Sequence, residues 1–453
     1  MPSTTGWLAR LGLGTPQARA WAMYDWANSA MVTLIVTAVF PIFYKSVTAV
    51  GLPDTVATYR FGIATTVALA ISAVLSPLLG TVADFTAGKK RFLGMFLLLG
   101  VLSTGLMFFL QQGMWAGALV LFMLANVGAN GSFVFYDALL PHVSPPEEMD
   151  RLSTSGYALG YLGGGVLLLL ALAMIQAPGL FGLPSGEGLT PAQASLPARI
   201  SFLLTAVWWV VFSIPLFRRI PEPPALPRPA TPAAGGALRT SIRQLGGTLR
   251  HLRQYRQAFL LLIAFLIYND GIGTIIRMAT IYGEERHLSR TVMIGAIAAV
   301  QFIGIPFSFL FGRLAGRIGA KRSIFIGLLV YVGISVLGYY MTTPLHFIVL
   351  ACLVGTVQGG TQALSRSLFA SMIPSQSSGE FFGFFSVFEK FAGIIGPLFF
   401  AVMVRSTGSS QSAILSIILF FVVGGALLAL VNVEEGQQQA RAAEAQLATH
   451  SWG

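Results

Sequence analysis

Twelve long apolar segments constrain the fold of this sequence more than any other feature. An α-helix of about 20 apolar residues crosses the roughly 30 Å hydrocarbon core of a bilayer. Because backbone N–H and C=O groups find no water in lipid, continuous apolar segments of this length must be helical. We predict membrane spans at residues 21–44, 61–83, 92–111, 114–139, 153–177, 198–217, 257–282, 291–312, 323–341, 344–370, 381–403 and 410–432.

The composition agrees with an integral membrane protein. Only 10% of the 453 residues are charged, against about 25% in a soluble domain, and the mean hydropathy is +0.74. A soluble fold of this composition would lack the polar side chains to cover its surface. A transmembrane β-barrel would show segments of about 10 alternating residues, whereas these segments are continuously apolar. The predicted class is therefore an all-α membrane fold.

The net charge of +11 is distributed unevenly between the two sides of the predicted membrane. With a cytoplasmic N-terminus, about twenty Lys and Arg residues fall on the cytoplasmic side, Arg366 among them, and about six on the other. This positive-inside bias predicts a multi-pass protein of the cell inner membrane with both termini in the cytoplasm. Because topology accounts for the basic residues, no nucleic-acid partner is expected.

One segment, 218–256, interrupts the apolar pattern between the sixth and seventh spans. It is rich in Pro and Ala and ends in a basic stretch that suits an interfacial amphipathic helix. Six spans lie on each side, an outline that resembles transporters of the major facilitator superfamily. The predicted units are an N-terminal half at 1–217, a cytoplasmic linker at 218–256, a C-terminal half at 257–433 and a cytoplasmic tail at 434–453.

Two loops at equivalent places in the halves resemble the G-x-x-x-D-R-x-G-R-K-R loop of that superfamily. They read GTVADFTAGKKR from Gly80 and GRLAGRIGAKR from Gly312. An acid at a helix end can face a neighbouring helix N-terminus, and a basic run can bind anionic headgroups. The acid position holds Asp84 in the first loop but Gly316 in the second, so we expect a latch in the first half and a weakened one in the second. An ordinary basic turn is the alternative for either loop alone. The gating residues predicted here are Gly80, Asp84, Gly88, Lys89, Lys90, Arg91, Arg317 and Arg322.

Further segments resemble one branch of that superfamily, the vacuolar-effluxer-like transporters, which includes autophagy-related fungal vacuolar amino-acid effluxers and bacterial relatives. The resemblance implies efflux, with amino acids as the best-known cargo class. The segments are WAMYDWANSA (21–30), FYDALLP (135–141), SGYALGYLGG (155–164), YNDGIGTI (268–275), GGTQALSRS (359–367), and FEKFAG (388–393) leading to GP (396–397).

The seventh span carries the densest polar pattern. Asn269, Gly273 and Arg277 follow i, i+4, i+8 and share one helix face, and Asp270 lies on nearly the same face. An acid and an arginine so placed could clamp a zwitterion, Asp270 meeting an ammonium group and Arg277 a carboxylate. A structural Asp270–Arg277 pair is the alternative. Gly271 and Gly273 predict a local helix break that frees backbone groups, or else close helix packing.

Spans one, four, seven and ten line the central cavity in the superfamily that this chain resembles. Span four presents Asn126 and Asn130, and span ten Gln358 and Gln362, each pair at i, i+4. Interhelical amide contacts, worth about 0.6–2 kcal/mol, are the alternative. The candidate substrate-binding residues are Asn28, Asn126, Asn130, Tyr268, Asn269, Asp270, Arg277, Gln358 and Gln362. Asp25, near the cytoplasmic end of span one, is predicted to gate, with a helix-capping role as the alternative.

Span eleven contains two adjacent charges, Glu389 and Lys390. A charge inside the bilayer needs a partner, and adjacent side chains on a helix do not face each other, so we expect each to pair with another helix. Asp270, Glu389 and Lys390 are candidates for proton coupling or an intramembrane pair. Gly396-Pro397 predicts a kink.

Span five repeats glycine at Gly156, Gly160 and Gly164. Small residues at four-residue spacing form a seam along which two helices approach closely. We expect this seam to serve helix packing and motion.

These features predict a secondary active transporter that moves a small polar solute, amino acids first, by alternating access. A transport-dead sensor or scaffold, or an exporter of another metabolite or drug, is the alternative. No P-loop motif and no clustered metal ligands appear, so neither enzyme activity nor a cofactor or metal is expected. The expected partners are the solute, membrane lipid and protons as the coupling ion, and the chain is expected to act as a monomer.

Overall fold

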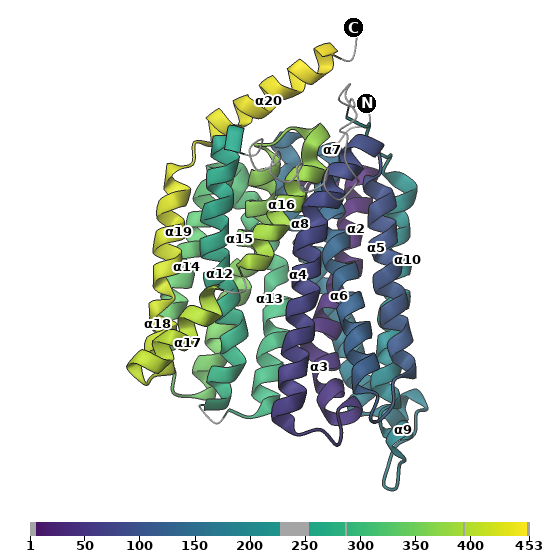
Figure 1. The fold of residues 1–453 in the computed structure, drawn as a ribbon. Coiled ribbons are helices and arrows are strands. Elements are labelled where there is room, and N and C mark those ends of the chain that lie inside the picture. The colour runs from purple at the N-terminus through teal and green to yellow at the C-terminus, as the bar shows by residue number, and fades with distance from the viewer. Residues whose placement is uncertain (1–5, 227–252, 286–287, 393–394, 451–453) are drawn as a thin grey trace, which may run out of the picture.

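The computed structural model describes residues 6–226, 253–285, 288–392 and 395–450. Every regular element in this part of the chain is helical (Figure 1). Twelve helical segments in the described residues are long and apolar enough to cross a membrane. The predicted all-α membrane fold is therefore confirmed.

The first six spans occupy the N-terminal half. Span one is bent, passing through two π-helical stretches, and its entry is capped by the Thr15 side chain, which accepts a hydrogen bond from the amide of Ala18. The elements are α1 (Trp7–Arg10), α2 (Pro16–Met31), η1 (Val32–Ala38), α3 (Val39–Phe43), η2 (Tyr44–Thr48), α4 (Asp54–Thr86), α5 (Lys89–Leu106), η3 (Met107–Phe109), α6 (Trp115–Ala138), α7 (Leu140–Val143), α8 (Pro146–Gln176), η4 (Pro178–Phe181), α9 (Pro191–Ala194) and α10 (Leu196–Arg219).

The last six spans form the C-terminal half and are followed by an amphipathic helix. Residues 227–252 of the predicted linker, with most of its expected interfacial helix, lie outside the described residues. The elements are α12 (Arg256–Glu285), α13 (Arg290–Ile318), α14 (Ala320–Tyr339), α15 (Pro344–Ala370), η5 (Ser375–Ser377), α16 (Ser378–Phe391), α17 (Ile395–Thr407), α18 (Ser410–Ser416), α19 (Ile418–Leu430) and α20 (Val433–His450).

Span eleven is divided, and span seven is not. The predicted kink is present, because α16 ends at Phe391 and α17 begins at Ile395. Pro397 lies in the first turn of α17, a position at which a helix tolerates proline. The break predicted at Gly271 and Gly273 is wrong, because α12 runs continuously past both. A Cβ on Gly271 would crowd the Phe420 and Phe421 side chains of α19, so this glycine serves close helix packing.

The glycine seam of α8 packs against α2. A Cβ on Gly156 would lie 2.8 Å from Asp25 Oδ2, and one on Gly164 would lie 2.7 Å from Thr33 Oγ1. Gly160 meets Ser29 between them. The expectation that these glycines permit a close helix contact is therefore confirmed.

Both ends of the described chain lie at one end of the bundle, where α1 and α20 are found (the upper end in Figure 1). We call this end the termini face and the other end the opposite face. Near the termini face, helices of the two halves touch through their backbones. A Cβ on Gly80 of α4 would collide with the carbonyl oxygen of Gly379, and one on Gly383 of α16 would overlap Pro77.

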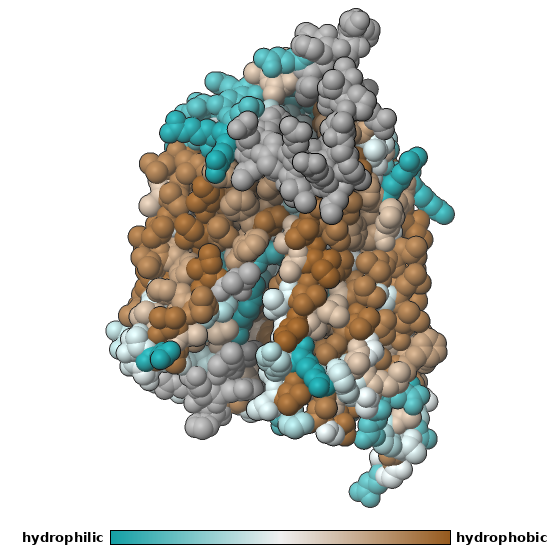
Figure 2. All heavy atoms as spheres, in the orientation of Figure 1, coloured by the Kyte–Doolittle hydropathy of each residue, from teal (hydrophilic) through white to brown (hydrophobic). Residues whose placement is uncertain are grey.

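Figure 2 shows a broad band of hydrophobic side chains across the face of the bundle in view. It also shows a furrow between the two halves, with a hydrophilic base, that opens toward the opposite face. On the face seen in Figure 2, the halves are thus closely joined near the termini face and parted toward the opposite face.

Disulfide trapping tests this contact. Ser76 Oγ of α4 and Ser386 Oγ of α16 lie 3.5 Å apart. Cys352, the single cysteine of the sequence, is first replaced by Ser so that it cannot form other disulfides. The pair Ser76→Cys/Ser386→Cys should then form a disulfide under mild oxidation. With a protease site inserted at 227–252, the cleaved halves should migrate together on a non-reducing gel.

The pair Ser72→Cys/Ser386→Cys is the matched control, because Ser72 lies one helical turn, about 5.4 Å, farther along α4. It should crosslink much less. Equal yields from the two pairs would contradict the contact described here.

Candidate functional site

The first predicted latch joins the two halves. Asp84, at the end of α4, is fully buried. Its carboxylate accepts hydrogen bonds from the amides of Gly379 (3.0 Å) and Glu380 (2.7 Å) in the first turn of α16. Lys89 Nζ lies 2.6 Å from the same carboxylate. An acid of one half thus binds the positive N-terminal end of a helix of the other.

The basic residues of this loop bind protein groups. Lys89 is buried against Asp84, and Lys90 Nζ donates to the carbonyls of Phe217 (3.0 Å) and Ile220 (2.5 Å). The expected headgroup contact is therefore wrong for these two lysines, whereas Arg91 is exposed.

The amide of Lys90 donates to the carboxylate of Glu222, at 3.0 and 3.1 Å to its two oxygens. Burial raises the pKa of the Glu222 carboxyl, and the hydrogen bond from Lys90 opposes that rise. Glu222 therefore ties the start of the connection between the halves to the first loop, next to Gly88, the residue that precedes α5.

The second loop contains no such latch. Arg317 near the end of α13 and Arg322 at the start of α14 are exposed and form no ion pair within the described residues. Gly316, at the acid position, faces the guanidinium of Arg151 on α8.

A buried arginine forms a second link between the halves. Arg366 of α15 is only 3% exposed. Its Nη1 lies 2.9 Å from Asp137 Oδ1 on α6, and its Nη2 lies 3.5 Å from Asp25 Oδ2 on α2. Its Nε also donates to Ser153 Oγ of α8 (3.0 Å). The assignment of Arg366 to the basic cytoplasmic residues is therefore wrong, because it reaches into the N-terminal half and compensates two acids there.

Aromatic rings surround this arginine. Its guanidinium carbon lies 4.9, 5.5 and 4.7 Å from the ring centroids of Trp21, Tyr136 and Tyr157, within the range of cation–π attraction. The Tyr136 hydroxyl also donates to Asp25 Oδ2 (3.0 Å). Asp25 lies inside α2, which Thr15 caps, so the helix-cap alternative for Asp25 is wrong.

Spans seven and ten meet through polar side chains that the sequence analysis singled out. Gln362 Nε2 donates to Asn269 Oδ1 (3.3 Å), and the hydroxyls of Tyr268 and Ser365 lie 2.6 Å apart. Gln358 is half-buried on α15, one turn before Gln362. The structure therefore brings residues of two predicted cavity helices together.

The asparagines of spans one and four behave differently. Asn28 Nδ2 donates to Ser132 Oγ of α6 (3.1 Å). The amides of Asn126 and Asn130 donate to carbonyls of their own helix, those of Phe122 and Asn126. The alternative of an interhelical amide contact is therefore wrong for the side-chain N–H groups of Asn126 and Asn130.

Asp270 is a buried acid that forms no ion pair within 4.0 Å among the described residues. Its residue is 1% exposed, and neither carboxylate oxygen has a hydrogen-bond partner among the described residues. A Cβ on Gly396, in the first turn of α17, would lie 2.9 Å from Asp270 Oδ1. No ion pair within 4.0 Å joins Asp270 to Arg277, but the two charged groups lie within electrostatic range of each other. Arg277 is exposed, and its guanidinium folds back beside Gly273.

Glu389 and Lys390 pair with each other, with Nζ 2.8 Å from Oε2. The expectation that each pairs with another helix is therefore wrong, because the long, flexible stems span the angle between adjacent positions. Their side chains are 39% and 15% exposed, respectively. Glu389 also lies within electrostatic range of Asp137 and Tyr157.

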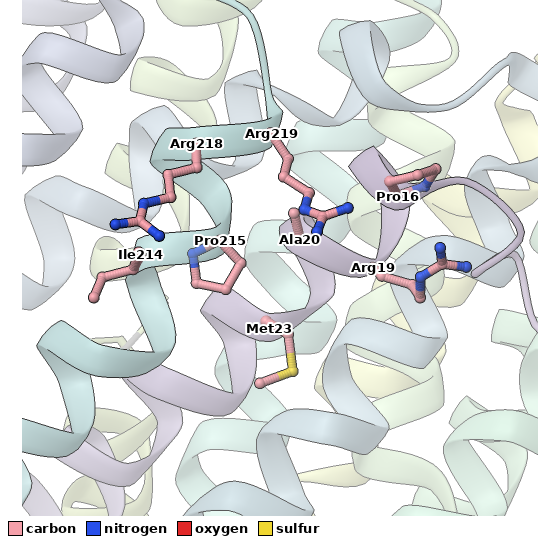
Figure 3. A pocket seen from close by; sticks show the side chains of 8 residues that line it. All are labelled: Pro16, Arg19, Ala20, Met23, Ile214, Pro215, Arg218 and Arg219. Carbon is pink, nitrogen blue, oxygen red and sulfur yellow. The ribbon is translucent and has the colours of Figure 1, made fainter.

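A pocket of about 410 Å³ opens between α2 and α10, away from the predicted binding residues. In Figure 3, Arg218 and Arg219 extend from α10 on one side, Arg19 from α2 on the other, and Met23 lies below them. Arg19 Nη1 donates to the carbonyls of Leu13 (3.1 Å) and Gly14 (3.3 Å). Because only the N-terminal half forms this recess, it is not the site predicted between the halves. Among the described residues, no group of three His, Cys, Asp or Glu could hold a metal ion.

Replacing Arg366 by Gln should lower the free energy of unfolding by about 3–5 kcal/mol, because breaking a buried pair leaves uncompensated charges. Denaturant titration of the purified protein measures this change. The triple variant Asp25→Asn/Asp137→Asn/Arg366→Gln should recover part of the loss, since it also removes the stranded acids. A single variant as stable as the wild type would contradict the role given to Arg366.

Comparisons with known proteins place this arrangement in a family. The family model described as "Vacuole effluxer Atg22 like" matches residues 54–441. An uncharacterised MFS-type transporter of Bacillus subtilis (strain 168), YxiO, is 38% identical over 421 residues, which are 93% of this chain and 96% of that protein. Autophagy-related protein 22 of Yarrowia lipolytica is 26% identical over 322 residues, 64% of this chain and 51% of its own. The chain thus spans about half the length of this fungal relative.

Solved structures show the same fold at low sequence identity. The E. coli fucose:proton symporter FucP matches with a TM-score of 0.68 at 13% identity, over 92% of this chain and 98% of that one. The human organic anion transporter MFSD10 (TETRAN) matches with a TM-score of 0.66 at 13% identity, over 94% and 100%. The fold, the family model and the long match to YxiO agree, and the chain belongs to the Atg22-like vacuole effluxer family of major facilitator superfamily transporters.

Proposed function

We propose that this chain is a secondary active transporter that exports a small polar solute by alternating access, with amino acids as the first cargo class to test. The observation that carries the proposal is Asp270, a buried carboxylate on α12 that forms no ion pair within 4.0 Å among the described residues and lies within electrostatic range of Arg277 on the same helix. A buried charge without a partner is costly. Asp270 therefore needs a proton or a cationic group of a ligand.

The arrangement on α12 suits a zwitterion. Three residues of an α-helix rise about 4.5 Å, so a guanidinium folded back beside Gly273 lies roughly one turn from Asp270. An ammonium group would meet the carboxylate, and a carboxylate group would accept two hydrogen bonds from the guanidinium. The linked amides of Asn269 and Gln362 offer neutral donors and acceptors beside this pair.

Proton coupling is part of the same proposal. Asp270 would exchange a proton for the ammonium group of the ligand. The half-exposed Glu389–Lys390 pair, close to Asp137, offers a route by which this exchange affects the Arg366 contacts at the termini face.

We propose that the termini face is cytoplasmic and that the protein lies in the cell inner membrane. The positive-inside bias supports this orientation. Because α1 and α20 lie at the same end (Figure 1), one orientation holds for both termini. The furrow of Figure 2 would then open away from the cytoplasm.

Replacing Asp270 by Asn should reduce amino-acid flux into proteoliposomes by about tenfold to a hundredfold, because a hydrogen bond to a charged group contributes about 1.5–3 kcal/mol. Counterflow of a panel of labelled amino acids, with and without a pH gradient, measures the flux. Asp54→Asn is the matched control, since Asp54 is an exposed acid in the first turn of α4.

Undiminished flux in Asp270→Asn, with normal membrane insertion, would remove Asp270 from the mechanism. Absence of flux for every solute in the wild type would instead favour the sensor or scaffold alternative.

A further inference from the structure

The two repeated loops lie at equivalent helix contacts. Gly80 of α4 touches the start of α16, and four residues later Asp84 binds the first amides of that helix. In the other half, Gly312 of α13 touches α8 about two helical turns after its start, where a Cβ on Gly312 would collide with Thr154 Oγ1. Both contacts join one half to the other at the termini face.

The second contact differs in charge at the position of the acid. A Cβ on Gly316, four residues after Gly312, would lie 3.1 Å from Arg151 Nη2. The first contact thus carries a carboxylate between the halves, whereas the second presents a guanidinium next to a residue without a side chain.

More arginines gather around this position. A pocket of about 300 Å³ is lined by Gly316 and by arginines from α1, α8 and α13, namely Arg10, Arg151, Arg313 and Arg317. No ion pair within 4.0 Å joins any of these four to an acid of the described residues. The neighbouring Asp150 accepts a hydrogen bond from Ser367 Oγ (2.5 Å) across the halves.

Four like charges around one small pocket repel each other, and an anion between them relieves that repulsion. The planar guanidinium fork matches the oxygens of a phosphate group in geometry and charge. Basic residues that serve membrane topology need only lie at helix ends. Membrane topology alone therefore does not explain why four arginines from both halves line one pocket.

We propose that this pocket binds a phosphate group, either that of an anionic lipid headgroup or free inorganic phosphate, and that the bound anion supplies at the second contact the negative charge that Asp84 supplies at the first. Arg10 and Arg151 belong to the N-terminal half, and Arg313 and Arg317 to the C-terminal half. The anion therefore holds the two halves together at the termini face.

A consequence for transport rests on the proposed alternating access, whereas the binding does not. Opening of the termini face would separate α8 from α13 and divide the four arginines. A ligand shifts a conformational equilibrium by its difference in affinity for the two states. Bound phosphate would thus favour the closed termini face.

Thermal unfolding of the full-length protein in a neutral detergent tests binding without reference to transport. The wild type should gain several degrees in Tm with phosphatidylglycerol or with inorganic phosphate, and little with phosphatidylcholine. In Arg313→Gln/Arg317→Gln, the ligand concentration for half the shift should rise at least tenfold. The control Arg256→Gln/Arg441→Gln removes two exposed arginines outside the pocket and should respond as the wild type does.

A complementary variant adds the missing charge. Gly316→Asp should raise the Tm without ligand and reduce the ligand-induced shift, because its carboxylate would lie beside Arg151. If the double arginine variant does not fold, the ligand-induced Tm shift of Gly316→Asp still tests the proposal. A shift with phosphatidylglycerol alone identifies a lipid site, and an equal shift with inorganic phosphate identifies a free-anion site. No shift in the wild type with either ligand, or an unchanged shift in both Arg313→Gln/Arg317→Gln and Gly316→Asp, would overturn the proposal.

Discussion

Buried charges shared between the two halves hold the termini face closed. Arg366 of the C-terminal half compensates Asp25 and Asp137 of the N-terminal half, and Asp84 of the N-terminal half binds the first amides of α16. A charge removed from water is costly unless it keeps a partner. Opening this face therefore requires that water or other groups replace those partners. The contacts that stabilise the closed termini face therefore also make its opening depend on any group that adds or removes a charge there.

The binding region and the closed face are physically connected. Tyr268 on α12 contacts Ser365 on α15, the residue next to Arg366. Gln362, one turn earlier on α15, binds Asn269. A ligand that engages α12 would act on the helix that carries the central arginine of the inter-half network. In alternating access, this connection would let occupancy of one site bias the contacts of the other.

The sequence was sufficient for features that follow from composition and spacing. Continuous apolar segments predict the twelve spans, and the Gly156–Gly160–Gly164 spacing predicts a close helix contact on this span, although not that α2 is the partner. Features that depend on helix rotation and depth were not predictable from one chain. Arg366 stands near the end of an apolar segment. At such a position an arginine can either extend to the membrane surface or be buried in the protein, and the sequence pattern is the same in both cases. The acids that it binds lie more than 200 residues away.

Local rules also failed where flexible side chains or close packing decided the outcome. Glu389 and Lys390 are adjacent and yet paired, and Gly271 serves helix packing inside an unbroken α12. One signal in the sequence pointed to the Arg366 network. Asp137 near the end of span four and Arg366 near the end of span ten lie at about the same predicted depth as Asp25. Charged residues of opposite sign at the same predicted depth on different spans should therefore be considered as ion pairs before basic residues are assigned to the cytoplasmic side.

Paired distance measurements between spin labels test the central claim, that the halves rock against each other about the buried contacts. One pair would report on the termini face, at the exposed Arg91 and Arg322, and one on the opposite face, at the exposed Gln112 and Thr342. On Asp84→Asn substitution, the account predicts a longer distance at the termini face together with a shorter one at the opposite face. Distances that remain unchanged at both faces, or that lengthen at both, would contradict it.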